Sequence, residues 1–139
     1  MLVSDVMTAN PVLLDSDCTV LEAAKIMRDE DCGIVPIMEG NKVVGVLTDR
    51  DIVVYSLAEE KDAGKTPVSE IMSEDVVTCK EDEFLENIAD RMSINGVRRL
   101  IVLNSQERIV GIVSIHDLMV NIGDEKMTDE VVHHLLRYA

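Results

Sequence analysis

An internal repeat constrains this chain more than any other feature of its sequence. Residues 3–7 (VSDVM) recur 65 residues later as residues 68–72 (VSEIM). After one inserted residue the offset becomes 66, and residues 43–48 fall on residues 109–114. A repeat that keeps its register this long indicates one structural unit used twice. Because a unit of about 55 residues has only a marginal core of its own, we expect the two units to pack sheet against sheet.

Both repeats predict the same order of elements. Apolar residues recur at helical spacing at positions 20, 23, 24 and 27, and again at positions 85, 88, 89 and 92. Asp17 and Asp82 lie just upstream as candidate N-caps. A short extended run precedes each of these helices, two β-rich runs joined by a polar turn follow it, and a second amphipathic helix closes the unit. The sequence therefore predicts an α/β fold in which β-α-β-β-α occurs twice with pseudo-two-fold symmetry.

The predicted boundaries follow from this repeat. Repeat 1 covers residues 1–62, repeat 2 covers residues 66–122, and residues 123–139 form a C-terminal tail. The linker is expected around residues 59–66, where Gly64 and the following Pro67 interrupt regular structure. Within the tail, residues 128–138 predict an amphipathic helix, which could pack against its own core or against a second chain.

Charge and composition exclude several classes of protein. The formal net charge is −14 over 139 residues, and only two Tyr, one Phe and no Trp are present. Nucleic acid is therefore an unlikely partner, since its affinity comes chiefly from basic residues and stacking platforms. No apolar run reaches the roughly 18 residues that a membrane span needs. We expect a cytoplasmic protein whose three cysteines are reduced and mostly buried.

The strongest site signal lies where a buried strand meets a helix, at GVLTDRD (residues 45–51) and GIVSIHD (residues 111–117). In both, a hydroxyl residue ends the strand and a carboxylate follows three residues later, as Thr48 with Asp51 and Ser114 with Asp117. A hydroxyl can bind phosphate or ribose, a helix N-terminus favours phosphate, and a carboxylate can accept from a ribose diol. The same spacing is also typical of a helix capping box, and the two interpretations are compatible.

These junctions, the A-A-x-x-M helix and the two-fold repeat together resemble a pair of CBS (cystathionine β-synthase-type) domains, over residues 3 to about 122. The resemblance implies that nucleotides bind in two clefts between the repeats. It also implies that four residues contact the ribose and phosphate of these nucleotides: Thr48 and Asp51 at one site, and Ser114 and Asp117 at the other. It also implies that the backbone of Asn10-Pro11-Val12 and of Asp75-Val76-Val77 frames the base.

The two implied sites differ in their basic residues. The family's phosphate-binding basic position is filled by Arg98 and Arg99 in the second repeat, but by Gly33 and Ile34 in the first. Arg50 at the first junction is replaced by His116 at the second, and a histidine is mostly uncharged at neutral pH. We therefore expect unequal sites.

The sequence favours a regulatory sensor that binds AMP, ADP, ATP or S-adenosylmethionine and signals by a change of conformation or assembly to an effector protein that remains unknown. A homodimer is expected, because the apolar helical faces left over after the sheets pack would associate. A module that only dimerises, with its T-x-x-D pairs serving as caps, is the alternative. No enzymatic activity, cofactor or metal is expected, since neither the adjacent His133 and His134 nor any acid–base pair has suitable spacing.

Overall fold

The computed structural model describes residues 1–121, and its contacts divide the chain into two compact units. The first, here called the continuous unit, consists of Val12–Val76. The second, the split unit, joins Met1–Pro11 to the chain from Val77 onward. Each unit thus contains most of one sequence repeat, but the first eleven residues belong to the unit of the second repeat. The predicted C-terminal helix over residues 128–138 lies outside the described residues.

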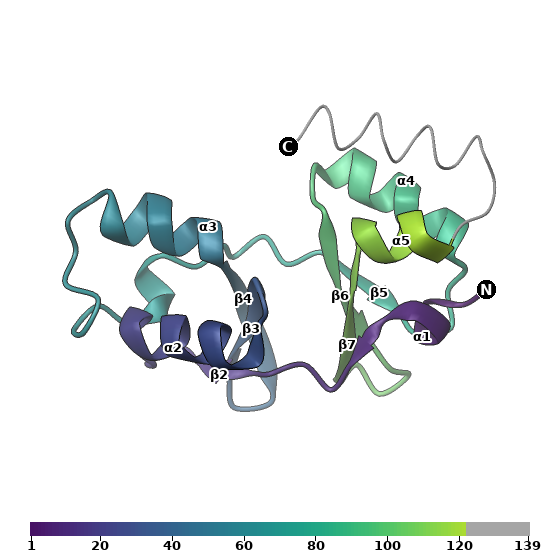
Figure 1. Ribbon diagram of the computed structural model, residues 1–139. Coiled ribbons are helices and arrows are strands. Elements are labelled where there is room, and N and C mark those ends of the chain that lie inside the picture. Colours follow the sequence, from purple (N-terminus) through teal and green to yellow (C-terminus); the bar gives the residue numbers. More distant parts are fainter. Residues whose placement is uncertain (122–139) are drawn as a thin grey trace. The chain divides into compact units, whose positions relative to one another are not determined.

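The continuous unit is a three-stranded sheet packed against helices. Strand β2 runs parallel to β3, and β3 pairs antiparallel with β4 in the order β2-β3-β4. Figure 1 shows α2 and the helix that begins at α3 packed together beside this sheet. The elements are β2 (Leu14–Asp15), α2 (Val20–Glu30), β3 (Ile34–Glu39), β4 (Lys42–Thr48), α3 (Asp49–Asp51), the π-helix η1 (Ile52–Leu57) and the 3-10 helix η2 (Val68–Glu70).

The core of the continuous unit follows the predicted periodicity. Val20, Ala23 and Met27 of α2 are buried, as the spacing of apolar residues predicted. They pack with the inward-facing residues of the sheet, including Val35 and Leu47. Burying these apolar side chains supplies the main driving force for this unit.

The predicted linker is part of the continuous unit. The N–H groups of Val20 and Leu21 donate to the carbonyl oxygens of Thr66 and Ala63, both at 2.9 Å. Thr66 itself is buried, and its hydroxyl donates to the carbonyl oxygen of Asp62 at 2.8 Å. The segment after η1 therefore satisfies the free amides at the start of α2, which a loose linker would leave to water.

The predicted N-caps were wrong by two residues. Helix α2 is capped by Thr19, whose hydroxyl accepts from the N–H of Glu22 at 3.2 Å, so Asp17 lies in the preceding turn. The N-cap of α4 is Phe84, with no side-chain hydrogen bond, and Asp82 lies outside the helix. Both aspartates precede the point at which the backbone turns helical, so their carboxylates cannot reach the second or third amide of the helix.

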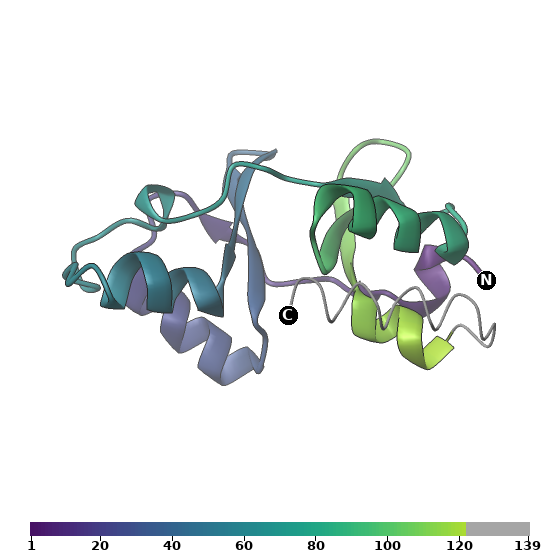
Figure 2. The same cartoon turned by 90° about the horizontal axis from the view of Figure 1, so that it is seen from above.

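The split unit has a four-stranded sheet in the order β1-β7-β6-β5. Strand β5 is parallel to β6, and β7 pairs antiparallel with both β6 and β1. Seen from above, α4 and α5 lie alongside each other (Figure 2). The elements are α1 (Val3–Val6), β1 (Thr8–Ala9), β5 (Thr78–Lys80), α4 (Leu85–Asn95), β6 (Arg99–Leu103), β7 (Ile109–Ser114) and α5 (Ile115–Asn121).

A half-buried ion pair braces the split unit. Arg91 of α4 donates to both carboxylate oxygens of Glu83, at 2.6 and 2.9 Å, and to the carbonyl oxygen of Thr78 at 3.1 Å. The hydrogen bonds from Arg91 hold the pKa of Glu83 below its ordinary value. The equivalent positions in the first repeat are Ile26 and Cys18, so this brace between helix and strand occurs in one repeat only.

Candidate ligand-binding site

Both strand–helix junctions form reciprocal capping boxes. The N–H of Thr48 donates to Oδ2 of Asp51 at 2.9 Å, and the N–H of Asp51 donates to Oγ1 of Thr48 at 3.1 Å. At the other junction, the N–H of Ser114 donates to Oδ2 of Asp117 at 2.8 Å, and the N–H of Asp117 donates to Oγ of Ser114 at 3.2 Å. The capping interpretation is therefore confirmed. Within residues 1–121 the Oδ1 atoms of both aspartates accept no hydrogen bond, so a ligand could still reach them.

Next to each junction, a second segment of the chain lies close against the strand that ends there and pairs with it; this close pairing is called the crossing below. In the continuous unit, Val46 exchanges two hydrogen bonds of 2.9 Å with Ser73. In the split unit, β1 pairs with β7 so that Thr8 lies opposite Ile112. Thr8 and Ser73 are themselves repeat equivalents, so the two crossings are the same structure made twice.

The glycine of each junction motif makes this crossing possible. A Cβ on Gly45 would lie 2.8 Å from the carbonyl oxygen of Ser73 and 2.6 Å from Sδ of Met72. A Cβ on Gly111 would lie 2.9 Å from the carbonyl oxygen of Thr8 and 2.5 Å from Sδ of Met7. Only glycine allows such close approach of two backbones without a shift of one of them.

The residues predicted to frame the base follow directly after these crossings. The N–H of Asn10 donates to the carbonyl oxygen of Val110 at 3.1 Å, and Asn10 has a left-handed φ of 53°. Pro11 ends the part of the split unit that comes from the N-terminus. Asn10 thus lies beside Val110, near the start of β7, whereas Ser114 ends that strand.

The second predicted framing segment divides between the units. Val76 ends the continuous unit just beyond Ser73, and its N–H donates to the carbonyl oxygen of Glu74 at 2.9 Å. Val77 belongs to the split unit, where its carbonyl oxygen accepts from the N–H of Ile101 at 3.1 Å. Val12, the first residue of the continuous unit, packs against that unit's core.

The predicted basic residues differ between the two junctions. Arg99 lies directly opposite Ser114 in the β6–β7 pairing, whereas Ile34 lies directly opposite Thr48 in the β3–β4 pairing. Directly opposed residues of an antiparallel pair point to the same face of the sheet. Arg98 precedes Arg99, and its carbonyl oxygen accepts from the N–H of Ile115 at 2.9 Å.

Three arginines lie at or beside the two junctions. In the described part of the chain, the guanidinium groups of Arg50, Arg98 and Arg99 take part in no hydrogen bond or ion pair. They are therefore free to meet an anionic ligand.

A surface cavity of about 590 Å³ opens at Asp51 and continues along η1. Its lining includes three carboxylates (Asp51, Glu59 and Glu70), the ring of Tyr55 and Lys61. Nζ of Lys61 lies 3.7 Å from Oε2 of Glu70, so its charge is already matched within the cavity. This cavity was not predicted from the sequence.

The role of the two crossing segments was not predicted from the sequence. Thr8 and Ser73 each follow the repeated V-S-x-x-M run directly, so a hydroxyl residue recurs in register there. That recurrence was the available signal. Asp51 was predicted as a site residue, but the cavity that it shares with Glu59, Lys61 and Glu70 was not, because it depends on how η1 and the segment before β5 pack in space.

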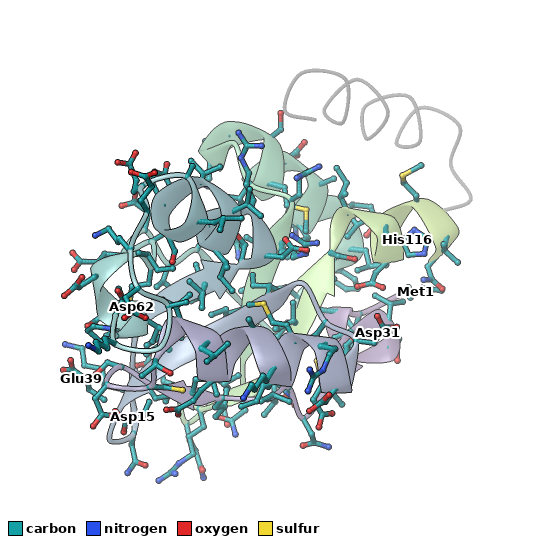
Figure 3. All side chains as sticks on the ribbon, turned by 60° about the vertical axis from the view of Figure 1, so that its left-hand side comes forward. Met1, Asp15, Asp31, Glu39, Asp62 and His116 are labelled. Carbon is teal, nitrogen blue, oxygen red and sulfur yellow. The ribbon has the colours of Figure 1, made fainter. Side chains whose placement is uncertain are left out.

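The region that the structure covers also contains cysteine, histidine and carboxylate side chains outside the two junctions. No group of three His, Cys, Asp or Glu residues there could hold a metal ion. Burial raises the pKa of Cys79 to about 12, and burial with a hydrogen bond to Glu22 raises that of Cys18 to about 11. His116 is exposed on α5 (Figure 3).

No helix among residues 1–121 is long and apolar enough to cross a membrane.

Two β-α-β-β-α units, each with a hydroxyl–carboxylate junction behind a glycine crossing, define a tandem-repeat protein of the CBS type. The family model described as "CBS domain" matches residues 3–58 and 68–124. The chain therefore belongs to the CBS domain family, and the predicted family and fold class are confirmed.

Relatives include both small CBS proteins and larger enzymes. The chain is 38% identical over 119 residues to the CBS domain-containing protein YhcV of Bacillus subtilis, covering 86% of this chain and 84% of that protein. It is 35% identical over 126 residues to L-aspartate semialdehyde sulfurtransferase of Methanocaldococcus jannaschii, covering 90% of this chain but 24% of the enzyme.

A solved structure of a CBS pair with ligands is also similar. The CBS domain pair of protein MJ0100, in complex with 5'-methylthioadenosine and S-adenosyl-L-methionine, is 33% identical with a TM-score of 0.76. The match covers 86% of this chain and 94% of that one.

Proposed function

We propose that this protein is a regulatory module that binds adenosyl ligands at its two junctions and has no catalytic activity of its own. The observation that carries the proposal is the pair of equivalent hydroxyl–carboxylate junctions, each with one carboxylate oxygen that accepts no hydrogen bond within residues 1–121. The ligand would be AMP, ADP, ATP or S-adenosylmethionine. The bound compounds of the similar MJ0100 pair, both adenosyl compounds, support this ligand class.

In this proposal the aspartates bind ribose through their free Oδ1 atoms. Oδ2 of Asp51 and of Asp117 caps the helix, which fixes the carboxylate and aims Oδ1 away from the capping bond. An oriented carboxylate loses little freedom on binding, so its hydrogen bonds to a ribose diol are favourable. In the split unit, Arg99 opposite Ser114 would meet a phosphate.

Calorimetric titration of single-site variants tests this function. Asp51→Ala and Asp117→Ala should each weaken an adenosyl ligand at their own site by roughly 1.5–3 kcal/mol, the value of a charged hydrogen bond. Each should also lose about 0.5–2 kcal/mol of folding free energy with the cap. Asp5→Ala is the matched control, because Asp5 also caps an N-terminus, accepting from Leu2 at 2.8 Å, at a distance in the sequence from both junctions.

The alternative, a module that only dimerises, predicts a different result. Binding of ATP, AMP or S-adenosylmethionine at one hundred times its Kd should raise the free energy of unfolding by about 2.7 kcal/mol. If thermal denaturation shows no shift with any of these ligands, the junctions serve as caps only.

We also propose that the protein forms homodimers through its helices. Large apolar side chains remain exposed on both units, among them Leu57 at 72%, Ile94 at 83% and Val120 at 68%. Each of them lies on a helix, and exposed apolar helical faces often become association surfaces. Leu57→Lys with Ile94→Lys should shift the protein toward monomer in sedimentation experiments at micromolar concentration. A wild type that is monomeric under these conditions would exclude this assembly.

A further inference from the structure

The two junctions share one backbone geometry but carry opposite charge, and we propose that they select different adenosyl compounds. The split-unit junction takes a phosphorylated nucleotide. The continuous-unit junction takes an adenosyl compound without phosphate and prefers a cationic one, such as a sulfonium. The proposal deepens the proposed function and rests on it, because it requires that both junctions bind an adenosyl group.

The first difference lies on the strand opposite the hydroxyl residue. In the split unit, Arg99 faces the same side of the sheet as Ser114, with which it is paired in register. In the continuous unit, the paired residue is Ile34, opposite Thr48. A phosphate at the hydroxyl would therefore meet a guanidinium in one unit and an aliphatic side chain in the other.

The second difference lies at the start of the following helix. In the continuous unit, the carboxylate of Asp49 accepts from the N–H of Arg50 at 2.9 Å. It therefore occupies an amide that a phosphate would otherwise bind, and it adds a negative charge beside Thr48. The equivalent residue in the split unit is Ile115, which brings no charge.

The third difference is the acidic cavity that opens at Asp51. Asp51, Glu59 and Glu70 line it, and its one lysine is already paired with Glu70. The exposed ring of Tyr55 adds a face of negative electrostatic potential. Carboxylates and an aromatic face together attract sulfonium and ammonium groups and repel phosphate.

The acidity of the whole chain does not explain this contrast. Both junctions lie in a protein with a net charge of −14. The split-unit junction has two arginines without ion-pair partners among residues 1–121, whereas the continuous-unit junction has one, Arg50, which lies between Asp49 and Asp51 in the sequence. The asymmetry is therefore local and should appear as ligand choice.

Titration of variants that keep one junction tests the proposal. Asp117→Ala leaves the continuous-unit junction, which should bind S-adenosylmethionine most tightly, adenosine next and AMP most weakly. Asp51→Ala leaves the split-unit junction, which should show the reverse order. Each step in the order should be about threefold, the effect of one exposed charge.

Placing an arginine opposite Thr48, as the split unit has opposite Ser114, should abolish the preference of the continuous-unit junction for S-adenosylmethionine over AMP. In the Asp117→Ala background, Ile34→Arg should raise the affinity for AMP relative to S-adenosylmethionine about tenfold, or two exposed-charge steps. Leu21→Arg is the matched control, because it adds the same charge at an exposed position of α2 in the same unit. Asp49→Asn removes the carboxylate from the start of the helix without changing the strand. It should also raise the affinity for AMP relative to S-adenosylmethionine, so it tests the inference even if Ile34→Arg fails to fold.

The outcomes separate this inference from the proposed function. If the wild type binds none of the three compounds, the proposed function fails and the inference fails with it. If both single-junction variants bind with the same order of ligands, the junctions bind adenosyl groups without selecting between them, and only the inference is overturned. The same holds if Leu21→Arg changes the ratio as much as Ile34→Arg, or if Asp49→Asn leaves it unchanged.

Discussion

Gly111→Ala should loosen the N-terminal segment from the split unit. The new Cβ would lie 2.9 Å from the carbonyl oxygen of Thr8, and ordinary contacts begin near 3.4 Å. The Sδ atom of Met7, 2.5 Å from the new Cβ, can move aside because the methionine side chain is flexible. The carbonyl oxygen of Thr8 cannot, because Thr8 is held by the pairing of β1 with β7. Strand β1 must therefore shift away from β7 by several tenths of an ångström.

The size of the effect follows from two opposing contributions. Overpacking of a close contact typically costs about 1–3 kcal/mol. Replacing glycine by alanine also restricts the unfolded chain, which stabilises the folded state by about 0.4–1 kcal/mol. We therefore expect a net loss of about 1–2 kcal/mol in the free energy of unfolding. Gly45→Ala should behave alike, because the carbonyl oxygen of Ser73 would lie 2.8 Å from its Cβ.

Urea denaturation and amide exchange measure this loss globally and locally. The amide of Asn10, which donates to Val110, should exchange faster in Gly111→Ala. Gly64→Ala is the control, since its Cβ would meet nothing closer than 3.4 Å and its φ is not left-handed. If Gly111→Ala is as stable as Gly64→Ala and the Asn10 amide is equally protected, the close crossing does not explain the glycine.

Three further results are expected. The pKa of Glu83 is lowered in the folded protein, so its pairing with Arg91 stabilises the fold at pH values above the ordinary glutamate pKa, and this stabilisation is lost as the pH falls through the folded-state pKa. Arg91→Met should therefore make unfolding less sensitive to acid, and it should lower the free energy of unfolding at pH 7, measured by urea denaturation, by about 1–2 kcal/mol. Cys79, with a pKa of about 12, should resist a thiol reagent at pH 8 in the folded protein and react rapidly in urea, and rapid reaction without urea would contradict its burial. Thr19→Ala should lower the free energy of unfolding by about 1 kcal/mol while Asp17→Ala does not, and equal losses would mean that the cap is misplaced.

Local patterns predicted the hairpins well. The runs 34–38 and 43–48 appear as Ile34–Glu39 paired with Lys42–Thr48, and the second hairpin matches equally closely. Runs rich in Val and Ile predict the strands, and Gly40 adopts the left-handed φ of 61° that the turn needs. The hydroxyl–carboxylate junctions were predicted for the same reason, since their spacing is a property of adjacent residues.

Features that depend on distant contacts were not predicted. The repeat indicates that Met7 and Met72 are equivalent, but it does not say which sheet either residue packs on. Asp17 was placed as a cap because hydroxyl and carboxylate residues compete for that role, and Thr19, two residues later, fills it. The π-helical geometry of η1, in which Ala58 donates to Val53 at 2.9 Å, has no simple sequence pattern. The base-framing roles of Asn10 and Val76 stay predictions.

The division into a continuous and a split unit has a consequence for synthesis on the ribosome. Val12–Val76 emerges as one uninterrupted stretch and can fold as soon as it leaves the exit tunnel. Met1–Pro11 emerges before Val12–Val76, yet its strand partner β7 begins at Ile109, so this segment cannot complete its pairing until almost the whole described chain has been made. Closing that long loop is an entropically slow step. A rearranged chain that begins at Val12 and carries residues 1–11 between Val76 and Val77 would make each unit continuous in sequence, and it should fold faster than the chain in its present order.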